Sequence, residues 1–331
     1  MRPSPQRIVR VISVLLLLLV VGAVGGNLAL LRQPILATPY PVAREGDTLR
    51  FVIVAPLYDH PVWQRVAAGA REAASELGVS VEYMGPRRAS LEELVTLLDM
   101  AAASQVDGII TQGLADTRVN QAIARATDRG IPVITVDTDQ PESAEQPRRR
   151  LAFVGTDNRT AGRFVAEDLL MRTRGQAVVG IVRDNLVPLE QDQRVQAFRE
   201  VVESTPGARI AAVVTTELNR TLAGTSALQM LREHPEITVV YATSAVATLG
   251  VVQSVARVEG DHPVFVVGWD YLVEPDDYLA RGTVHVMVQQ APDLMGRYAV
   301  EALEAYLRRD IRPASVIETP ITVRSGGDLP W

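Results

Sequence analysis

An uninterrupted apolar run at 131–136, IPVITV, constrains the fold of this chain more than any other stretch. It ends directly in Asp137, Thr138 and Asp139. Because both faces of such a run must be covered, it predicts a central strand of a parallel sheet with helices on either side. Ligands of open α/β sheets bind just beyond the carboxyl ends of the strands, so Asp137 and Thr138 are candidate binding residues. The alternative is that Asp137 only caps the following turn.

The same alternation of apolar strands and amphipathic helices runs through most of the chain and predicts parallel β-α units. A polar stretch at 140–150 and a fresh start of the alternation near 153–157 indicate two similar α/β halves. The expected strands are 51–55, 79–83, 106–110, 131–136, 151–154, 177–182, 210–215, 237–241, 263–267, 284–288, 315–318 and 321–323. The expected helices are 61–77, 90–104, 116–129, 157–171, 191–202, 222–233, 246–258 and 292–309.

Two of these helices carry end signals. Gly78 follows the first helix as a C-cap should, and Ser90 with Glu93 forms a capping box at the start of the second. Within the first helix, the residues expected on the apolar face are Val62, Val66, Ala70, Ala73 and Leu77.

Composition and motifs exclude several classes of function. The net charge is −6 and there is no basic block, which argues against a nucleic-acid partner. Cysteine is absent, so there is no disulfide, thiolate metal site or cysteine nucleophile. The four histidines lack the spacing of metal ligands, and no phosphate loop, dinucleotide fingerprint or nucleophile elbow occurs. The sequence therefore predicts neither an enzyme nor a cofactor.

An uncharged apolar span at 11–31 follows three arginines near the N-terminus. As a helix it is about 31 Å long, close to the hydrocarbon thickness of a membrane. We expect 1–32 to be a cleaved signal peptide or an uncleaved membrane anchor, and the length favours the anchor. A proline-containing linker at 33–48 follows. Because more arginines precede the span than follow it directly, the rest of the chain is expected outside the cytoplasm.

Polar and aromatic side chains recur where the expected strands end, which makes them candidates for one binding site. Carboxylate, guanidinium and amide groups beside indole rings suit a sugar or another polyol. Hydroxyls take paired hydrogen bonds, and the C–H face of the sugar ring lies on an aromatic plane. The candidate ligand-binding residues are Asp59, His60, Trp63, Asp137, Thr138, Arg194, Ser244, Asp270 and Gln290.

Several of these candidates have a purely structural alternative. Trp63 would also suit the core face of its helix, and Trp269 would also suit packing within its half of the chain. Arg194 suits an exposed helix position, and Asp270 suits a turn.

Six short stretches occur in an order that resembles the type I periplasmic solute-binding proteins of the ribose-binding class. They are PLYDHPVW, GIPVITVD, VGTDNRTAG, RVQAF, VVGWD and QQAPDLMG. The resemblance covers about 49–325 and implies an α/β fold of two doubly wound parallel-sheet lobes, joined by three crossing segments that act as a hinge. It implies a first lobe of 49–154 completed by about 291–313, and a second lobe of 155–290 completed by about 314–325.

The resemblance also implies roles for individual residues. Asp137 resembles the aspartate that grips sugar hydroxyls, and Arg194 resembles an arginine four residues before a helix phenylalanine. Asp270 and Gln290 resemble the aspartate of the second lobe and the glutamine of a crossing segment. Trp63 stands where the family has a stacking phenylalanine.

Three candidates depart from the ribose-binding pattern. His60 replaces an asparagine, Thr138 an arginine, and Ser244 an asparagine. These changes remove one cationic contact, so the sequence indicates a small polar solute without singling out ribose.

The function implied by the resemblance is capture of a small polar solute, above all a sugar, by a monomer that delivers it to an ABC-type permease. The alternative is a membrane-anchored sensor that signals to a membrane receptor or kinase, and the sequence does not separate the two. A hydrolase would need a nucleophile or metal that the sequence does not offer. A repressor would need a helix-turn-helix where the membrane span stands.

Overall fold

The computed structural model describes residues 48–141, 147–184, 188–217, 219–255, 264–270 and 275–326. These residues form two six-stranded sheets, and each sheet has one hydrophobic core on either face. The segment expected to be a signal peptide or anchor, 1–32, and all but the last residue of the expected linker lie outside the described residues. Within the described ranges, no helix combines the length and apolar character needed to cross a membrane.

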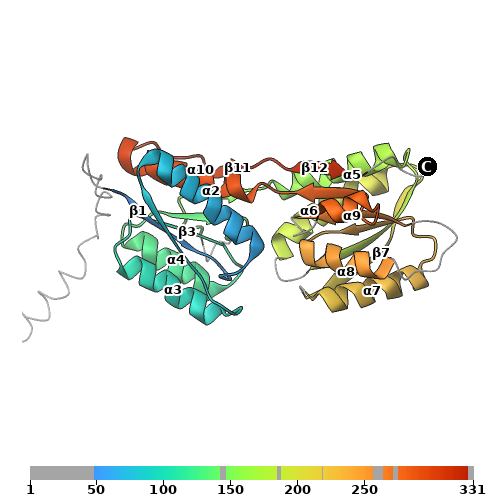
Figure 1. The fold of residues 1–331 in the computed structure, drawn as a ribbon, viewed down its shortest axis with the longest axis horizontal. Helices are drawn as coiled ribbons and strands as arrows, with labels where there is room; N and C mark the ends of the chain where they lie inside the picture. Colours follow the sequence, from blue (N-terminus) through green and yellow to red (C-terminus); the bar gives the residue numbers. More distant parts are fainter. Residues whose placement is uncertain are drawn as a thin grey trace, which may run out of the picture. The chain divides into compact units, whose positions relative to one another are not determined.

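The elements follow the expected alternation (Figure 1). The strands are β1 (Arg50–Val54), β2 (Ser80–Met84), β3 (Gly108–Thr111), β4 (Val133–Val136), β5 (Ala152–Gly155), β6 (Ala177–Asp184), β7 (Ala208–Thr216), β8 (Val239–Ala242), β9 (Phe265–Trp269), β10 (Val286–Gln289), β11 (Val316–Glu318) and β12 (Thr322–Ser325). The helices are α2 (Pro61–Leu77), α3 (Leu91–Ala103), α4 (Thr117–Asp128), α5 (Asn158–Arg172), α6 (Pro188–Ser204), α7 (Arg220–Glu233), α8 (Ala245–Val255), α9 (Pro275–Ala280) and α10 (Pro292–Arg309).

The two sheets share one topology. The first has the order β11-β5-β4-β3-β1-β2, and every neighbouring pair is parallel. The second has the order β12-β10-β9-β8-β6-β7, in which β12 alone is antiparallel to its neighbour. The prediction of two doubly wound parallel-sheet lobes is therefore confirmed. In each lobe, the carboxyl ends of the parallel strands meet at one edge, where ligands of such sheets bind.

The chain passes between the two sheets three times, at 156–157, at 290–291 and at 319–321. The structure differs from the expected lobe boundaries in the last part of the chain. The segment 314–325 was expected to complete the second lobe, but β11 pairs with β5 of the first sheet and only β12 joins the second. The Phe153 N–H donates to the carbonyl oxygen of Ser315 at 3.0 Å and begins this pairing.

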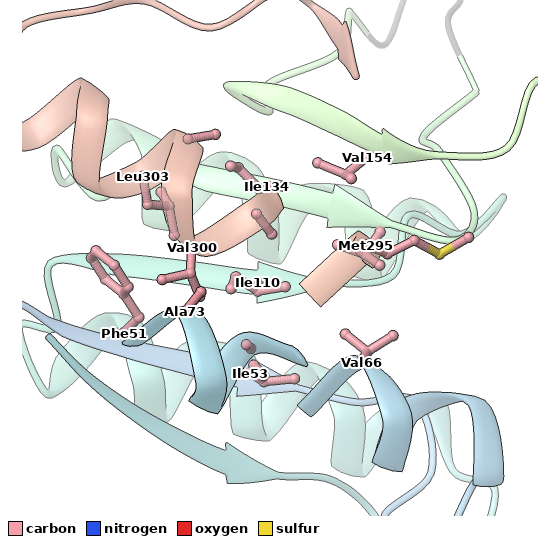
Figure 2. Packing of buried hydrophobic residues seen from close by; sticks show 14 of the residues in the cluster. Phe51, Ile53, Val66, Ala73, Ile110, Ile134, Val154, Met295, Val300 and Leu303 are labelled. Atoms are coloured by element: carbon pink, nitrogen blue, oxygen red, sulfur yellow. The ribbon is translucent and has the colours of Figure 1, made fainter. Parts of the chain in front are cut away.

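Helix α10 follows the last parallel strand of the second sheet but packs on the first, beside α2 (Figure 1). Figure 2 shows Val66 and Ala73 of α2 and Met295, Val300 and Leu303 of α10 packed over the strands of the first sheet. All five side chains are fully buried. The return of the last helix to the first lobe, which the family resemblance implies, is thus present.

The contact between α2 and α10 depends on two glycines. A Cβ atom added at Gly69 would overlap the carbonyl oxygen of Asp293, and one added at Gly296 would overlap that of Val66. The two helices therefore touch through their backbones at this crossing.

The expected helix ends are also present. Gly78 ends α2 in the left-handed conformation, with φ 63°, and its N–H donates to the carbonyl oxygen of Ala74. At the start of α3, the Ser90 hydroxyl oxygen accepts a hydrogen bond from the Glu93 N–H at 3.2 Å. The short helix α9 was not expected, because six residues are too few to show a helical period.

Replacing Ser90 with alanine is expected to lower the free energy of unfolding by about 1 kcal/mol, because the first turn of α3 loses its side-chain acceptor. Urea unfolding followed by circular dichroism measures the change. Ser90→Asp keeps an acceptor at the same place and should stay close to the wild type. If both variants lost the same free energy of unfolding, the N-cap hydrogen bond would not be the way in which Ser90 stabilises the protein.

Candidate functional site

Asp137 and Asp270 occupy matching places in the two sheets. Asp137 directly follows β4 and Asp270 directly follows β9, and these strands are third from the β11 and β12 edges of their sheets. Both residues have φ 69°, a left-handed conformation that is uncommon for residues other than glycine but favoured among them by aspartate. The N–H of Asp137 donates to the carbonyl oxygen of Val154 at 3.1 Å, and that of Asp270 to the carbonyl oxygen of Val288 at 2.7 Å.

Each aspartate is held by a glutamine from a neighbouring strand end. Gln112 follows β3 and donates from Nε2 to Oδ2 of Asp137 at 3.1 Å and to the hydroxyl of Thr138 at 3.0 Å. Gln290 follows β10 and donates from Nε2 to Oδ1 of Asp270 at 2.7 Å. Gln112 was missed in the sequence, although it follows the end of an expected strand as the other candidates do.

Arg194 of α6 is buried and fully engaged, so the alternative of an exposed helix arginine is wrong. Its Nε and Nη2 donate to Oδ1 of Asn158 at 3.1 and 2.6 Å, and its Nη1 donates to the carbonyl oxygen of Thr243 at 2.5 Å. The guanidinium carbon lies 3.6 Å from the centroid of the Trp269 ring. Such stacking and forked hydrogen bonding hold the planar group in one orientation.

The position of Arg194 depends on close packing between α5 and α6. A Cβ atom at Gly162 of α5 would overlap the carbonyl oxygen of Arg194, so only glycine lets the two helices approach this closely. One turn further along α6, the Phe198 ring stacks on Tyr241 of β8, with the centroids 4.4 Å apart. These contacts fix α6 over the second sheet.

Ser244 lies beside Thr243 and takes part in a buried polar group. Its hydroxyl donates to Oδ2 of Asp184 at the end of β6 and accepts from the Ala247 N–H at 3.1 Å, at the start of α8. The other carboxylate oxygen of Asp184 accepts from the Thr216 hydroxyl at 2.5 Å. Ser244 therefore holds a helix end in addition to the ligand role predicted for it.

The three candidates around the start of α2 have different surroundings. Asp59 is exposed. His60 is half-buried, and its Nδ1 is enclosed without a hydrogen-bond partner among the described residues. Burial lowers the pKa of His60, so its imidazole is neutral at pH 7. Trp63 is 1% exposed and belongs to the same core as α10, so it has the core position of its structural alternative, and its ligand contact stays a prediction.

Asp270 is electrostatically coupled to Arg194. Burial raises the pKa of Asp270, while the positive charge of Arg194 and hydrogen bonds with Gln290 and Trp269 lower it. The net shift is upward, so the free-energy cost of burying the charged carboxylate is larger than these three effects together. A ligand that donates further hydrogen bonds to the carboxylate would offset this cost.

The candidates thus form two connected sets. In the second lobe, Arg194, Ser244, Asp270 and Gln290 are linked through Thr243, Trp269 and their mutual contacts. In the first lobe, Asp137 and Thr138 are linked through Gln112. Both sets offer carboxylate acceptors at carboxyl ends of strands. Within the described ranges, no three acidic or histidine side chains are grouped as a metal site would require.

Comparison with known proteins gives consistent matches. Residues 51–310 match the family described as periplasmic binding protein domain. The D-ribose/D-allose-binding protein of Pseudomonas aeruginosa is 24% identical over 234 residues, which cover 69% of this chain and 72% of that protein. The structure of GanP, a glucose-galactose binding protein from Geobacillus stearothermophilus, is 37% identical with a TM-score of 0.76 and covers 86% of this chain and 100% of that one. A chain in the XylFII–LytSN complex is 26% identical with a TM-score of 0.72, at 86% and 100% coverage.

Proposed function

Because the chain belongs to the periplasmic binding protein family, as its sequence predicted, we propose that it captures a sugar outside the cytoplasm and delivers it to an ABC-type permease. The observation that carries this proposal is the pair of left-handed aspartates, Asp137 and Asp270, each held by a glutamine amide at a strand end. The relatives named for ribose, allose, glucose and galactose support a monosaccharide as the ligand.

The chemistry of the two aspartates suits neighbouring hydroxyls. An ionised carboxylate has about four acceptor positions and can accept a pair of hydroxyl groups while a glutamine N–H also donates to it. This suits the hydroxyl pairs of a sugar. Arg194 supplies positive charge beside Asp270 and is held rigidly by Asn158 and Trp269. A rigid site of this kind loses little conformational entropy when the ligand binds.

We place one ligand in contact with both aspartates, so that it links the two lobes. The three crossing segments are the elements about which the lobes would move. A sugar that bonds to Asp137 and Asp270 together stabilises the arrangement in which both reach it, and it shifts the lobe equilibrium toward that arrangement. The permease would then recognise the two lobe surfaces that closure brings together.

A sensor is the second candidate function. It is favoured by the similarity to a chain in the XylFII–LytSN complex. In this alternative the same sugar-bound lobes contact a membrane receptor or kinase. The family implies an extracytoplasmic location for either function. We further propose that the chain acts as a monomer and that 1–32 keeps it at the membrane.

The first test is the thermal unfolding of the full-length chain against a panel of pentoses, hexoses, polyols and amino acids. A ligand present at about 100 times its dissociation constant adds about 2.7 kcal/mol to the free energy of unfolding. We expect one sugar to raise the melting temperature and Asp137→Ala to remove the shift. Asp99→Ala, which removes a partly exposed carboxylate of α3 that pairs with Arg125 in the same lobe, should keep the shift. A shift with an amino acid and with no sugar would contradict the proposal.

A further inference from the structure

The first lobe has a polar cavity whose lining contains none of the predicted sugar contacts. Its volume is about 310 Å³, and it lies between the segment that leads into β5 and the segment that leads into β11. None of the described residues that line it is acidic. The lining residues are Arg148, Arg150, Leu151, Arg312, Pro313 and Ser315.

Arg150 forms the fixed base of this cavity. Its side chain is 2% exposed, and its Nε and Nη2 donate to the two carboxylate oxygens of Asp139, each at 2.6 Å. Its Nη1 donates to the carbonyl oxygen of Ser315 at 2.8 Å and to the Ser315 hydroxyl at 3.2 Å. The Asp139 carboxylate also accepts from the Thr135 hydroxyl at 2.9 Å, so its position is set by β4 as well.

The described residues that line the cavity make it basic. The Asp139 carboxylate, which binds Arg150, also pairs with Arg148, whose Nε lies 3.5 Å from Oδ2 of Asp139. Arg148 also donates from Nε to the carbonyl oxygen of Gln140 at 2.8 Å. Arg312 is exposed and makes no hydrogen bond or ion pair with the described part of the chain. Three guanidinium groups therefore line the cavity, and Asp139 is the carboxylate that pairs with two of them.

We propose that this cavity binds a phosphate group. Guanidinium groups match phosphate oxygens with paired N–H donors. All three nitrogens of Arg150 already donate to Asp139 and Ser315, so Arg150 would contribute positive charge, and the exposed Arg312 would supply N–H donors with Arg148 beside it. The volume lies at the lower end of the range for small-molecule pockets, which leaves room for a phosphate ester and a few attached atoms. Both an organic phosphate monoester and the diester headgroup of a membrane lipid carry this group.

The cavity is connected to the sugar contacts through a single loop. Asp139, which holds Arg150, stands two residues after Asp137 and directly after Thr138. A ligand that draws Arg148 or Arg150 toward itself would act on the same turn that presents Asp137. Phosphate binding at this cavity does not require the sugar site, so the two proposals can fail separately.

Isothermal titration calorimetry on the full-length chain, without sugar, tests the proposal with three soluble probes. They are inorganic phosphate, glycerol 3-phosphate and glycerophosphoglycerol, which is the diester headgroup of phosphatidylglycerol without its acyl chains. We expect at least one probe to bind, and Arg312→Gln to weaken its binding about tenfold, since a hydrogen bond to a charged group is removed. Binding should also weaken as sodium chloride is added.

The control is Arg232→Gln, which removes an exposed arginine from α7 of the second lobe and should leave binding unchanged. Arg312→Glu reverses the charge at the exposed position and should abolish binding without touching the buried Arg150. Tighter binding of inorganic phosphate or glycerol 3-phosphate assigns the site to a free phosphate compound, and tighter binding of glycerophosphoglycerol assigns it to a lipid headgroup. The proposal is overturned if no probe binds, or if both glutamine variants lose the same affinity.

Discussion

Replacing Gly296 with valine is expected to lower the free energy of unfolding by about 3 kcal/mol or more. The new side chain would overlap the carbonyl oxygen of Val66, and the Ala70 nitrogen lies 2.9 Å from the position of its Cβ atom. These are backbone atoms in the middle of α2, so they cannot move aside as the end of a side chain can. The two helices would have to separate, which opens the core that contains Met295 and Val300.

Urea unfolding of the full-length chain, followed by circular dichroism, measures this loss. Ala305→Val is the control, because it adds a valine to a partly exposed position of the same helix. Ala305→Val is expected to lower the free energy of unfolding by only about 0.5 kcal/mol, because valine has a lower helix propensity than alanine. Similar losses in the two variants would mean that the backbone contact between α2 and α10 does not determine stability.

Replacing Asp270 with asparagine is expected to weaken sugar binding at least about tenfold and, at the same time, to stabilise the free protein at neutral pH. Asparagine keeps the shape and an acceptor for Gln290 but removes the charge. The pKa of Asp270 is raised by burial even with Arg194 beside it, so the enclosed charge is a net cost without a ligand. Titration calorimetry measures the affinity, and thermal unfolding measures the stability.

The direction of the pH dependence follows from the raised pKa. Between the carboxyl pKa of the unfolded chain, 3.8, and the higher pKa in the folded protein, Asp270 takes up a proton on folding. Stability therefore falls as the pH rises through this window, and the cost is fully present above the folded pKa. In Asp270→Asn this contribution is lost. The prediction would be wrong if the variant were less stable than the wild type at pH 7 and kept the same pH profile.

The alternation of strands and helices could be read from the sequence because it depends on local hydrophobic periods and end signals, such as Gly78 and Ser90. The sheet that β11 joins could not be predicted from the sequence. The three residues of β11, Val316–Glu318, have no period of their own, and only the hydrogen bonds to β5 decide which sheet they join. The same limit applies to the matching positions of Asp137 and Asp270, which depend on the strand orders of both sheets.

The core face of α2 was predicted correctly in its centre, where Val66, Ala70 and Ala73 are buried, but not at its start. Val62 was expected on the apolar face, yet the structure buries Trp63 fully and leaves Val62 half-buried. The buried face also includes Gly69, which lies against Asp293 of α10, more than two hundred residues later in the chain. A pattern within one helix carries no information about a partner so distant in sequence.

The position of α10 has a consequence for how the chain assembles as it is made. The first lobe contains the strands between residues 50 and 155, but its core needs Met295 and Leu303, which are synthesised much later. The second lobe draws almost all of its core from a continuous stretch and can assemble earlier. Although domains usually fold in the order of synthesis, here the part made first should become stable last. An exported chain with this arrangement stays without a complete N-terminal core while it is being translocated.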